Sequence, residues 1–244
     1  SGTRIYDADG RDYLDFSANW GVANVGYCHP AVVKAVQDQV AKNTFSSHTT
    51  VVCEPTVELA ERLLALVPGG GEKRVWFGLS GSDANDCVAK LFPLATGRRR
   101  MISFFGAYHG QTMGSLSLSG HTAQARFIGQ GNVVKIAYPY CYRCPFGREQ
   151  DSCGFLCLDF LENWVFKSVC PPDDTAALLI EAVQCDGGDV PAPPGYHKRR
   201  KAICEKHGIL YVVDEVKIGF GRTGKMFGIE HYDVVPDAIV FGKP

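Results

Sequence analysis

The sequence predicts an α/β fold in which a mostly parallel sheet is covered by helices on both faces. Short apolar runs that fit buried strands alternate with longer runs that fit helices, which is typical of parallel sheets. The composition agrees, since 45% of the residues are hydrophobic and 21% are charged, as in an ordinary globular protein. The 25 basic and 26 acidic residues leave a formal net charge of −1. This balance argues against capture of nucleic acid or of an anionic membrane by bulk charge.

The beginning of the chain predicts a hairpin and two helices. Residues 4–16 carry apolar side chains on both sides of a turn at residues 7–10, as in a hairpin. Pro30 opens a helix whose valines recur on one face. A second helix covers residues 54–66 and ends where Pro68 is followed by three glycines.

Strands and helices alternate in the rest of the chain. We expect strands at residues 74–77, 100–105, 132–137, 176–181, 209–213 and 238–241, and helices at residues 82–95 and 194–207. Ligands of parallel sheets bind at the carboxyl ends of the strands. Four segments fall at such ends and are candidate sites: residues 80–85, 106–110, 181–188 and 214–224.

The chain has ten cysteines, and four of them lie together in an insertion at about residues 138–175. The spacing Cys141-x2-Cys144-x8-Cys153-x3-Cys157 resembles that of metal ligands, although the loop between the pairs is shorter than in common zinc ribbons. The alternative is a surface insertion with reduced thiols or local disulfides. We adopt this alternative and assign no metal site, with the four cysteines kept as a possible ligand set.

The sequence predicts neither a transmembrane segment nor a signal peptide. No run of about 18 apolar residues is present, so we expect no transmembrane helix. The first residues lack the basic and then apolar pattern of a signal peptide. We therefore expect a cytoplasmic protein.

Residues 80–85, Ser-Gly-Ser-Asp-Ala-Asn, join a strand to a helix and have the composition of a phosphate-binding loop. Small residues let the backbone approach a ligand, and free N–H groups at the start of a helix attract an anion. Capping of the helix by Ser82 or Asp83 explains the same residues without a ligand. Both interpretations stay open at this point.

Residues 219–225 formally match two nucleotide-binding patterns but fit neither well. In the P-loop pattern, Met226 stands where a Ser or Thr would bind magnesium. In the dinucleotide pattern, a long apolar helix should follow the glycines, and none does. A glycine-rich loop that shapes a site is the better interpretation.

Polar side chains follow three of the apolar strands. A carboxylate such as Asp214 is costly at the end of a buried strand unless it has a partner, either Arg222 or a cationic ligand atom. Lys243 is a Schiff-base candidate if a carboxylate site lies nearby, and otherwise a solvated lysine. Tyr108 could stack on a planar ligand and His109 could donate a hydrogen bond, but a core aromatic beside a satisfied histidine is the simpler explanation.

Taken together, the motifs resemble those of the class III (omega) aminotransferases, which are pyridoxal-phosphate (PLP) enzymes of fold type I. The resemblance is carried by the hairpin at residues 6–15, Gly-Tyr-Cys-His-Pro at 26–30, Ser-Gly-Ser-Asp-Ala-Asn at 80–85, Tyr-His-Gly at 108–110, Glu-Ala-Val-Gln-Cys-Asp-Gly-Gly at 181–188, Asp-Glu-Val-Lys at 214–217, the glycine loop at 219–224, and Pro-Asp-Ala-Ile-Val-Phe-Gly-Lys at 236–243. Each motif alone is weak evidence for the family, but the order and spacing of all of them together are specific to it.

The resemblance implies a domain organisation. Residues 1–42 would be an N-terminal segment of the small domain, and residues 43–244 would form the PLP-binding large domain, with the Cys-rich insertion inside it. The large domain would be a three-layer structure around a mostly parallel sheet. It would be incomplete, because the C-terminal part of the family's chain is absent from this sequence. The family also implies a homodimer with the site at the subunit interface.

The resemblance also implies roles for single residues. Lys243 would hold PLP as a Schiff base and move the substrate's proton, and Asp214 would keep the pyridine nitrogen protonated. Val216 and Tyr108 would sandwich the ring. The full implied cofactor set is Gly81, Ser82, Tyr108, His109, Glu181, Asp214, Val216, Lys217 and Lys243. The implied substrate pocket contains Asn19, Trp20 and Asp186.

Three residues depart from the family's pattern. Ala182 replaces a common proline, and Asp186 replaces a glutamate that in many members gates a carboxylate-binding arginine. Lys217 replaces a glutamine that usually faces the cofactor's phenolic oxygen. A cation at this position would favour the phenolate form.

We therefore expect an aminotransferase that moves an amino group from a terminal amine or an amino acid to an oxoacid by a ping-pong mechanism. Its partners would be these small molecules, with no nucleic acid and no membrane. The alternatives within the family are a phospho-lyase, an epimerase or racemase, and a decarboxylase. The alternative from another class is a non-catalytic Cys-rich metal-binding module.

Overall fold

The computed structural model describes residues 2–47, 50–124, 126 and 131–243. The chain divides into two compact units. The first unit consists of residues 1–75 and 243–244, and the second unit of residues 76–242. The domain boundary expected between residues 42 and 43 stays a prediction.

The first unit begins with the expected hairpin. Strands β1 (Arg4–Tyr6) and β2 (Asp12–Leu14) are antiparallel, and the carboxylate of Asp7 accepts two backbone N–H groups within the turn. The helices that follow are α1 (Ala18–Gly21), α2 (Pro30–Lys42) and α3 (Glu54–Leu66). Proline occupies the first turn of both longer helices, where a missing N–H group costs nothing. The hairpin and both helices expected here are confirmed.

The second unit is built on a five-stranded sheet in which all neighbouring strands are parallel. The strands, in their order across the sheet, are β4 (Val133–Ile136), β3 (Arg100–Phe104), β5 (Thr175–Glu181), β8 (Leu210–Asp214) and β9 (Ala238–Val240). The register pairs Glu181 with Asp214, so two acidic residues end adjacent strands side by side. The predicted α/β fold class with a mostly parallel sheet is confirmed.

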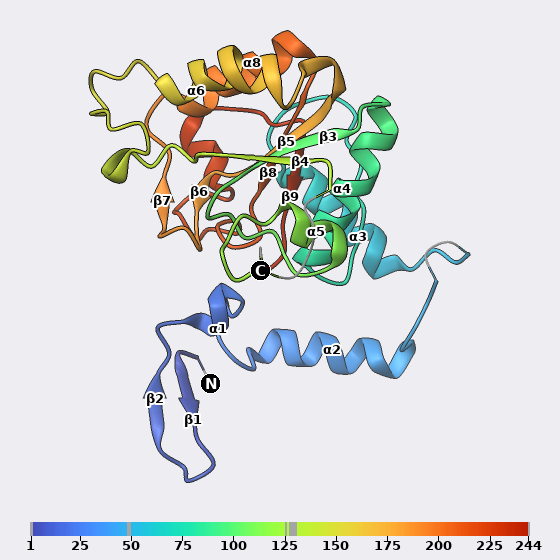
Figure 1. The fold of residues 1–244 in the computed structure, drawn as a ribbon. Helices are drawn as coiled ribbons and strands as arrows, with labels where there is room; N and C mark the ends of the chain where they lie inside the picture. Colours follow the sequence, from blue (N-terminus) through green and yellow to red (C-terminus); the bar gives the residue numbers. More distant parts are fainter. Residues whose placement is uncertain (1, 48–49, 125, 127–130, 244) are drawn as a thin grey trace. The chain divides into compact units, whose positions relative to one another are not determined.

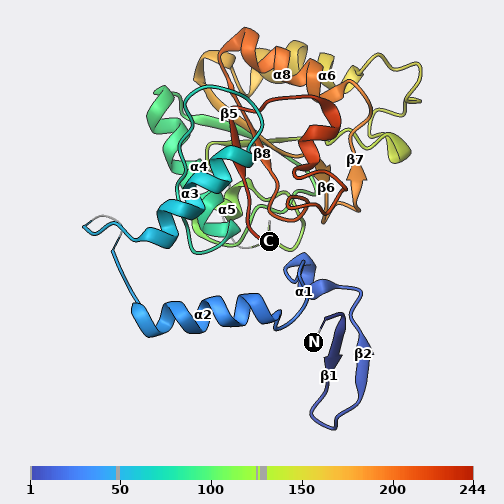
Figure 2. The same ribbon diagram turned by 180° about the vertical axis from the view of Figure 1, so that it is seen from behind.

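Helices cover both faces of this sheet (Figures 1 and 2). Helices α4 (Gly81–Thr96) and α5 (Met113–Leu118) lie on one face, and α6 (Leu156–Phe160) and α8 (Tyr196–His207) lie on the other. Strand β5 is buried over its full length, in agreement with the apolar run from Ala176 to Ile180 within it. The core between α4, α5 and the sheet is formed by Val88, Met101, Leu118, Ala177, Leu179, Val212 and Val240.

The structure departs from the expected elements at residues 74–77 and at several short elements, α1 and α6 among them. Residues 74–77 form no strand, and Trp76 is 53% exposed; no described strand supplies the hydrogen-bonding partner that a strand requires. Helix α5 and the hairpin of β6 (Val183–Gln184) and β7 (Val190–Pro191) were not expected, because they are too short for a periodic signal. Among the described helices, none has both the length and the apolar character needed to cross a membrane.

Candidate functional site

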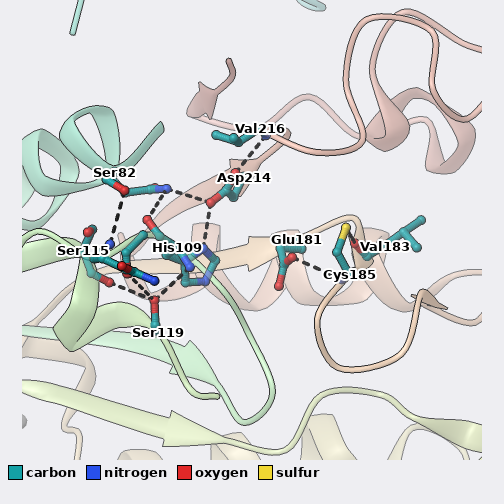
Figure 3. A network of polar contacts seen from close by, with 12 residues as sticks. Ser82, His109, Ser115, Ser119, Glu181, Val183, Cys185, Asp214 and Val216 are labelled. Carbon is teal, nitrogen blue, oxygen red and sulfur yellow. Dashed lines mark hydrogen bonds and ion pairs between the residues drawn. The ribbon is translucent and has the colours of Figure 1, made fainter. Parts of the chain in front are cut away.

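The candidate site is centred on Asp214 at the carboxyl end of β8 (Figure 3). Its side chain is only 4% exposed. Oδ2 accepts a hydrogen bond from Nδ2 of Asn85 at 2.7 Å and lies 2.7 Å from Nδ1 of His109. Oδ1 accepts the backbone N–H of Val216 at 2.9 Å. Partners on both oxygens therefore fix the carboxylate in one orientation.

Asn85 connects three elements at this point. It belongs to α4, is 1% exposed, and its Nδ2 also donates to the backbone carbonyl of His109 at 2.9 Å. Helix α4 starts at this place because Ser80 caps it, its hydroxyl accepting the N–H of Asp83 at 3.1 Å. The helix is thus capped, but by Ser80 and not by Ser82 or Asp83 as the sequence suggested, because the helix begins earlier, at Gly81. This cap places the start of a 16-residue helix beside the buried carboxylate.

Three backbone segments converge at the start of α4 and leave no room for side chains. A Cβ atom on Gly81 would lie 2.7 Å from Cγ1 of Val216, and one on Gly110 would lie 2.5 Å from Oγ of Ser82. The φ of Gly110, +121°, also favours glycine. The Cβ position of Gly242 lies 3.8 Å from the backbone nitrogen of Gly81. Backbone N–H groups at such a helix start can hold an anion such as a phosphate.

Glu181 is the second buried acid of the site, at the end of β5. Burial and the negative charge of Asp214 raise the pKa of Glu181 well above its ordinary value, although the backbone N–H groups of Cys185 and Tyr108 lower it. The N–H of Cys185 donates to Oε1 at 3.2 Å (Figure 3). The surroundings of Glu181 therefore favour its protonated form.

Several buried polar atoms of this site have no hydrogen-bond partner within the described residues. They are Oδ1 of Asn85, Nε2 of His109 and Oε2 of Glu181. Buried polar side-chain atoms are almost always paired. Their concentration around one carboxylate fits a site for a polar ligand.

Lys217 lies three residues after Asp214, and its ammonium group pairs with a carboxylate that was not expected from the sequence. Nζ of Lys217 donates to Oδ1 of Asp189 at 3.2 Å. Burial lowers the pKa of Lys217, but Cys185 and Asp189 raise it by more, so the pKa lies above its ordinary value. Lys217 is therefore a cation, and Asp189 offsets part of its charge.

The structure brings most of the predicted cofactor residues together at one end of the sheet. Those with contacts around Asp214 and the start of α4 are Gly81, Ser82, His109 and Val216, with Glu181 on the adjacent strand and the half-buried Tyr108 beside His109. Lys243 belongs to the first unit, with a left-handed backbone angle φ of +32°, and its role stays a prediction. Asn85 was missed as a single residue, although the motif at residues 80–85 contained it.

The three predicted substrate-pocket residues are divided between the two units. Asp186 is exposed on the loop between β6 and β7. Asn19 and Trp20 belong to the first unit, where both have left-handed backbone angles, with φ of +51° and +61°. Their role in a substrate pocket stays a prediction.

A fixed carboxylate beside a helix start crowded by small residues is the arrangement that the class III resemblance implies, and the family match decides the assignment. The Aminotransferase class-III family matches residues 1–244. The chain belongs to the class III aminotransferases. Their fold type I architecture agrees with the parallel sheet described above.

Named relatives of this class III chain include both aminotransferases and racemases. The leucine/methionine racemase of Thermococcus litoralis is 42% identical, over 99% of this chain and 54% of that protein. The 4-aminobutyrate aminotransferase of Escherichia coli is 36% identical, over 98% of this chain and 55% of that protein. The chain thus spans about half the length of the curated relatives that it matches.

Solved structures of transaminases superpose closely on this class III chain. The omega-aminotransferase of Paracoccus denitrificans has a TM-score of 0.93 at 28% identity, over all of this chain and 56% of that one. The taurine:2-oxoglutarate aminotransferase of Bifidobacterium kashiwanohense, solved with PLP and glutamate, has a TM-score of 0.89 at 31% identity, over 99% of this chain and 55% of that one.

PLP is the cofactor of this class III chain, and the residues of the site fit it. Asp214 offers a buried anion for the pyridine nitrogen, and the crowded start of α4 offers N–H groups for the phosphate. Oδ1 of Asn85 and Nε2 of His109, which have no partner among the described residues, are available for further hydrogen bonds at the same place.

Proposed function

We propose that the protein is a PLP-dependent aminotransferase that works as a homodimer and passes an amino group from a terminal amine or an amino acid to an oxoacid. The observation that carries the proposal is the buried carboxylate of Asp214, held by Asn85, His109 and the N–H of Val216. Such a carboxylate keeps a pyridine nitrogen protonated. The names of the relatives, among them a 4-aminobutyrate aminotransferase, support the proposal.

Besides Lys243, five residues would bind the cofactor through non-covalent contacts. Asp214 would hold the proton on the pyridine nitrogen, and the N–H groups of Gly81 and Ser82 would bind the phosphate. Val216 and Tyr108 would cover the two faces of the ring. Bound PLP supplies an electron sink for the negative charge that develops on the substrate carbon.

Lys243 would carry out the proton transfers. Its free amine would remove the proton from the substrate carbon that bears the amino nitrogen. The atom to which Lys243 then returns the proton decides the outcome of the reaction. In an aminotransferase, the donor leaves as a carbonyl product, and an oxoacid enters to take the amino group.

A racemase or epimerase is the second candidate, and one observation favours it. The relatives that are 40–42% identical are named leucine/methionine racemase, isoleucine 2-epimerase and alanine/serine racemase. In such an enzyme, the proton returns to the same carbon from its other side, and no oxoacid is needed. Lys243 and Asp214 would keep the roles given above.

The test compares the full-length wild type with Lys243→Ala. The wild type should show the visible absorption band of lysine-bound PLP, and the variant should lose this band and at least about 10³-fold in rate. Lys34→Ala, on the surface of α2, is the matched control and should keep both. A colourless wild type with added PLP would refute the proposal.

A second measurement separates the candidate reactions. An amine panel with 2-oxoglutarate and pyruvate as acceptors reports amino transfer. Exchange of the substrate's α-proton for deuterium together with inversion, without any oxoacid, indicates a racemase or epimerase. Release of phosphate and ammonia indicates a phospho-lyase, and release of carbon dioxide a decarboxylase.

A further inference from the structure

A buried polar network joins helix α8 to the end of β5. Its members are Tyr138, which follows β4, His197 on α8 and Tyr211 on β8, and each of them is at most 4% exposed. None of them is among the residues of the site around Asp214 described above. Buried polar groups are almost always hydrogen-bonded, so the partners of these three side chains show what the network holds in place.

The hydrogen bonds of His197 fix its tautomer. Nε2 lies 3.2 Å from the backbone carbonyl oxygen of Ala182, which can only accept, so Nε2 carries a proton and donates it. Burial lowers the pKa of His197 to about 3, so the ring is neutral and its Nδ1 is an acceptor. The hydroxyl of Tyr211 therefore donates to Nδ1, at 2.6 Å. Because both ring nitrogens have partners, the imidazole is held in one orientation.

Tyr138 donates to the same stretch of backbone. Its hydroxyl lies 3.1 Å from the carbonyl oxygen of Glu181 and 3.2 Å from that of Ala182, and its one proton is shared between them. Burial raises the pKa of Tyr138 well above its ordinary value, so the hydroxyl keeps this proton. The ring packs edge-on against Phe104, with 5.7 Å between the ring centres. Side chains from outside β5 thus hold the carbonyl groups of two successive residues.

These two residues lie where β5 ends beside the candidate site. A peptide unit is planar, so fixing the carbonyls of Glu181 and Ala182 limits rotation of the backbone that carries the Glu181 side chain. The register of the sheet sets Glu181 beside Asp214, and the N–H of Cys185 holds its Oε1 at 3.2 Å. The network therefore adds a restraint on the backbone of Glu181 to those on its position and its carboxyl group.

We propose that Tyr138, His197 and Tyr211 are positioning residues that hold the carboxyl group of Glu181 at the cofactor site around Asp214. They act through the backbone at the end of β5, not by contact with the cofactor. Oε2 of Glu181 has no partner in the described part of the chain, so the held carboxyl group has an oxygen available for PLP. The inference rests on the PLP site of the proposed function and adds residues that support it from the interior.

Tyr138 also connects the Cys-rich insertion at residues 138–175 to the site. The four clustered cysteines of the insertion are free thiols, and among the described residues no three His, Cys, Asp or Glu side chains are set around a metal ion. The contact that joins the insertion to the end of β5 is instead the hydroxyl of Tyr138.

The first test measures the affinity of the full-length apoenzyme for PLP by titration of the visible band. Tyr138→Phe removes only the hydroxyl, and the affinity should fall by about three- to tenfold. Tyr142→Phe, at an exposed tyrosine of the same insertion, is the matched control and should keep the wild-type affinity. Wild-type affinity in Tyr138→Phe would overturn this inference alone, whereas a wild type that binds no PLP would refute the proposed function as well.

A double-mutant cycle shows whether the network acts through Glu181. In the background of Glu181→Ala, which lacks the carboxyl group to be positioned, Tyr138→Phe should cause no further loss of affinity for PLP. A loss of equal size in both backgrounds would mean that the hydroxyl supports the fold in general, and the positioning role would be refuted.

Substitution of the histidine provides a conservative rescue. His197→Leu removes the donor to Ala182 and should weaken PLP binding at least as much as Tyr138→Phe, whereas His197→Gln keeps an N–H donor and should recover most of the affinity. Equal affinities in the two folded variants would contradict the inference. If neither variant folds, Tyr211→Phe removes only the hydroxyl that orients the imidazole and should weaken PLP binding by about two- to threefold. An unchanged affinity in Tyr211→Phe would then count against the network.

Discussion

Asp214 and Arg200 are buried charges of opposite sign in the same unit, and their surroundings differ. Both oxygens of Asp214 have partners, from Asn85, His109 and Val216. The guanidinium of Arg200 lies on aromatic rings, and two of its nitrogens have no acceptor among the described residues. The difference shows that burial alone does not determine whether a charged side chain is satisfied, since the carboxylate has a partner at each oxygen and the guanidinium does not have one at each nitrogen. The two side chains should therefore respond differently to substitution.

The change with the largest expected effect is Asp214→Asn. The amide keeps the size of the carboxylate but cannot hold a proton on the pyridine nitrogen, so kcat should fall by roughly 10³-fold. Steady-state rates and the visible band of bound PLP check this. Asp151→Asn, on the exposed insertion loop, is the control and should keep the wild-type rate. A wild-type rate in Asp214→Asn would show that the carboxylate only positions its hydrogen-bond partners and does not act on the cofactor.

Arg200→Met tests the other side of the comparison. Removal of an uncompensated buried charge should leave the free energy of unfolding unchanged or raise it by about 1–4 kcal/mol. Urea unfolding of the wild type and the variant measures the difference. Lys198→Met, at an exposed position of the same helix, is the control and should match the wild type. A strong loss of stability in Arg200→Met would mean that Arg200 already has its anion.

Glu215, the next residue after Asp214, is a third buried charge and predicts a pH effect on stability. Burial raises the pKa of Glu215 to about 7, although the N–H groups of Gly228 and Ile229 at 2.9 Å and 2.8 Å lower it. Because the folded state prefers the protonated acid, this stabilisation is present below the ordinary pKa of 4.5 and is lost as the pH rises through 7. The loss amounts to at most about 3 kcal/mol.

Glu215→Gln should therefore flatten the dependence of the unfolding free energy on pH between about 5 and 8. Glutamine does not titrate, and it keeps one acceptor oxygen, for the N–H of either Gly228 or Ile229, which donate to different oxygens of Glu215. Denaturant unfolding at several pH values measures the slope. Glu149→Gln, at an exposed position of the insertion, should retain the wild-type slope. An unchanged slope in Glu215→Gln would assign the pH dependence to another group.

The sequence predicted the strand-end carboxylate far better than the buried cation. Asp214 ends an unbroken apolar run, so its place at the edge of the sheet follows from local pattern. Its bond to Asn85, a residue 129 positions away, depends on how α4 packs on the sheet and has no local signal. Arg200 lies in the run Tyr-His-Lys-Arg-Arg-Lys, which has the composition of a solvated helix face. Only the packing of α8 against Phe104 shows that this arginine is buried.

The smallest expected effect concerns Lys217, whose charge is already partly offset. If this cation favours the phenolate of PLP, Lys217→Gln should shift the pH titration of the visible band upward by only about 0.5–1 unit, because Asp189 pairs with it at 3.2 Å. Asp189→Asn is the matched counterpart. It removes the carboxylate and leaves the lysine, so it should shift the titration downward. Identical titrations in the wild type and Lys217→Gln would contradict the proposed effect, since the pair would then act only to hold the loop of Asp189 in place.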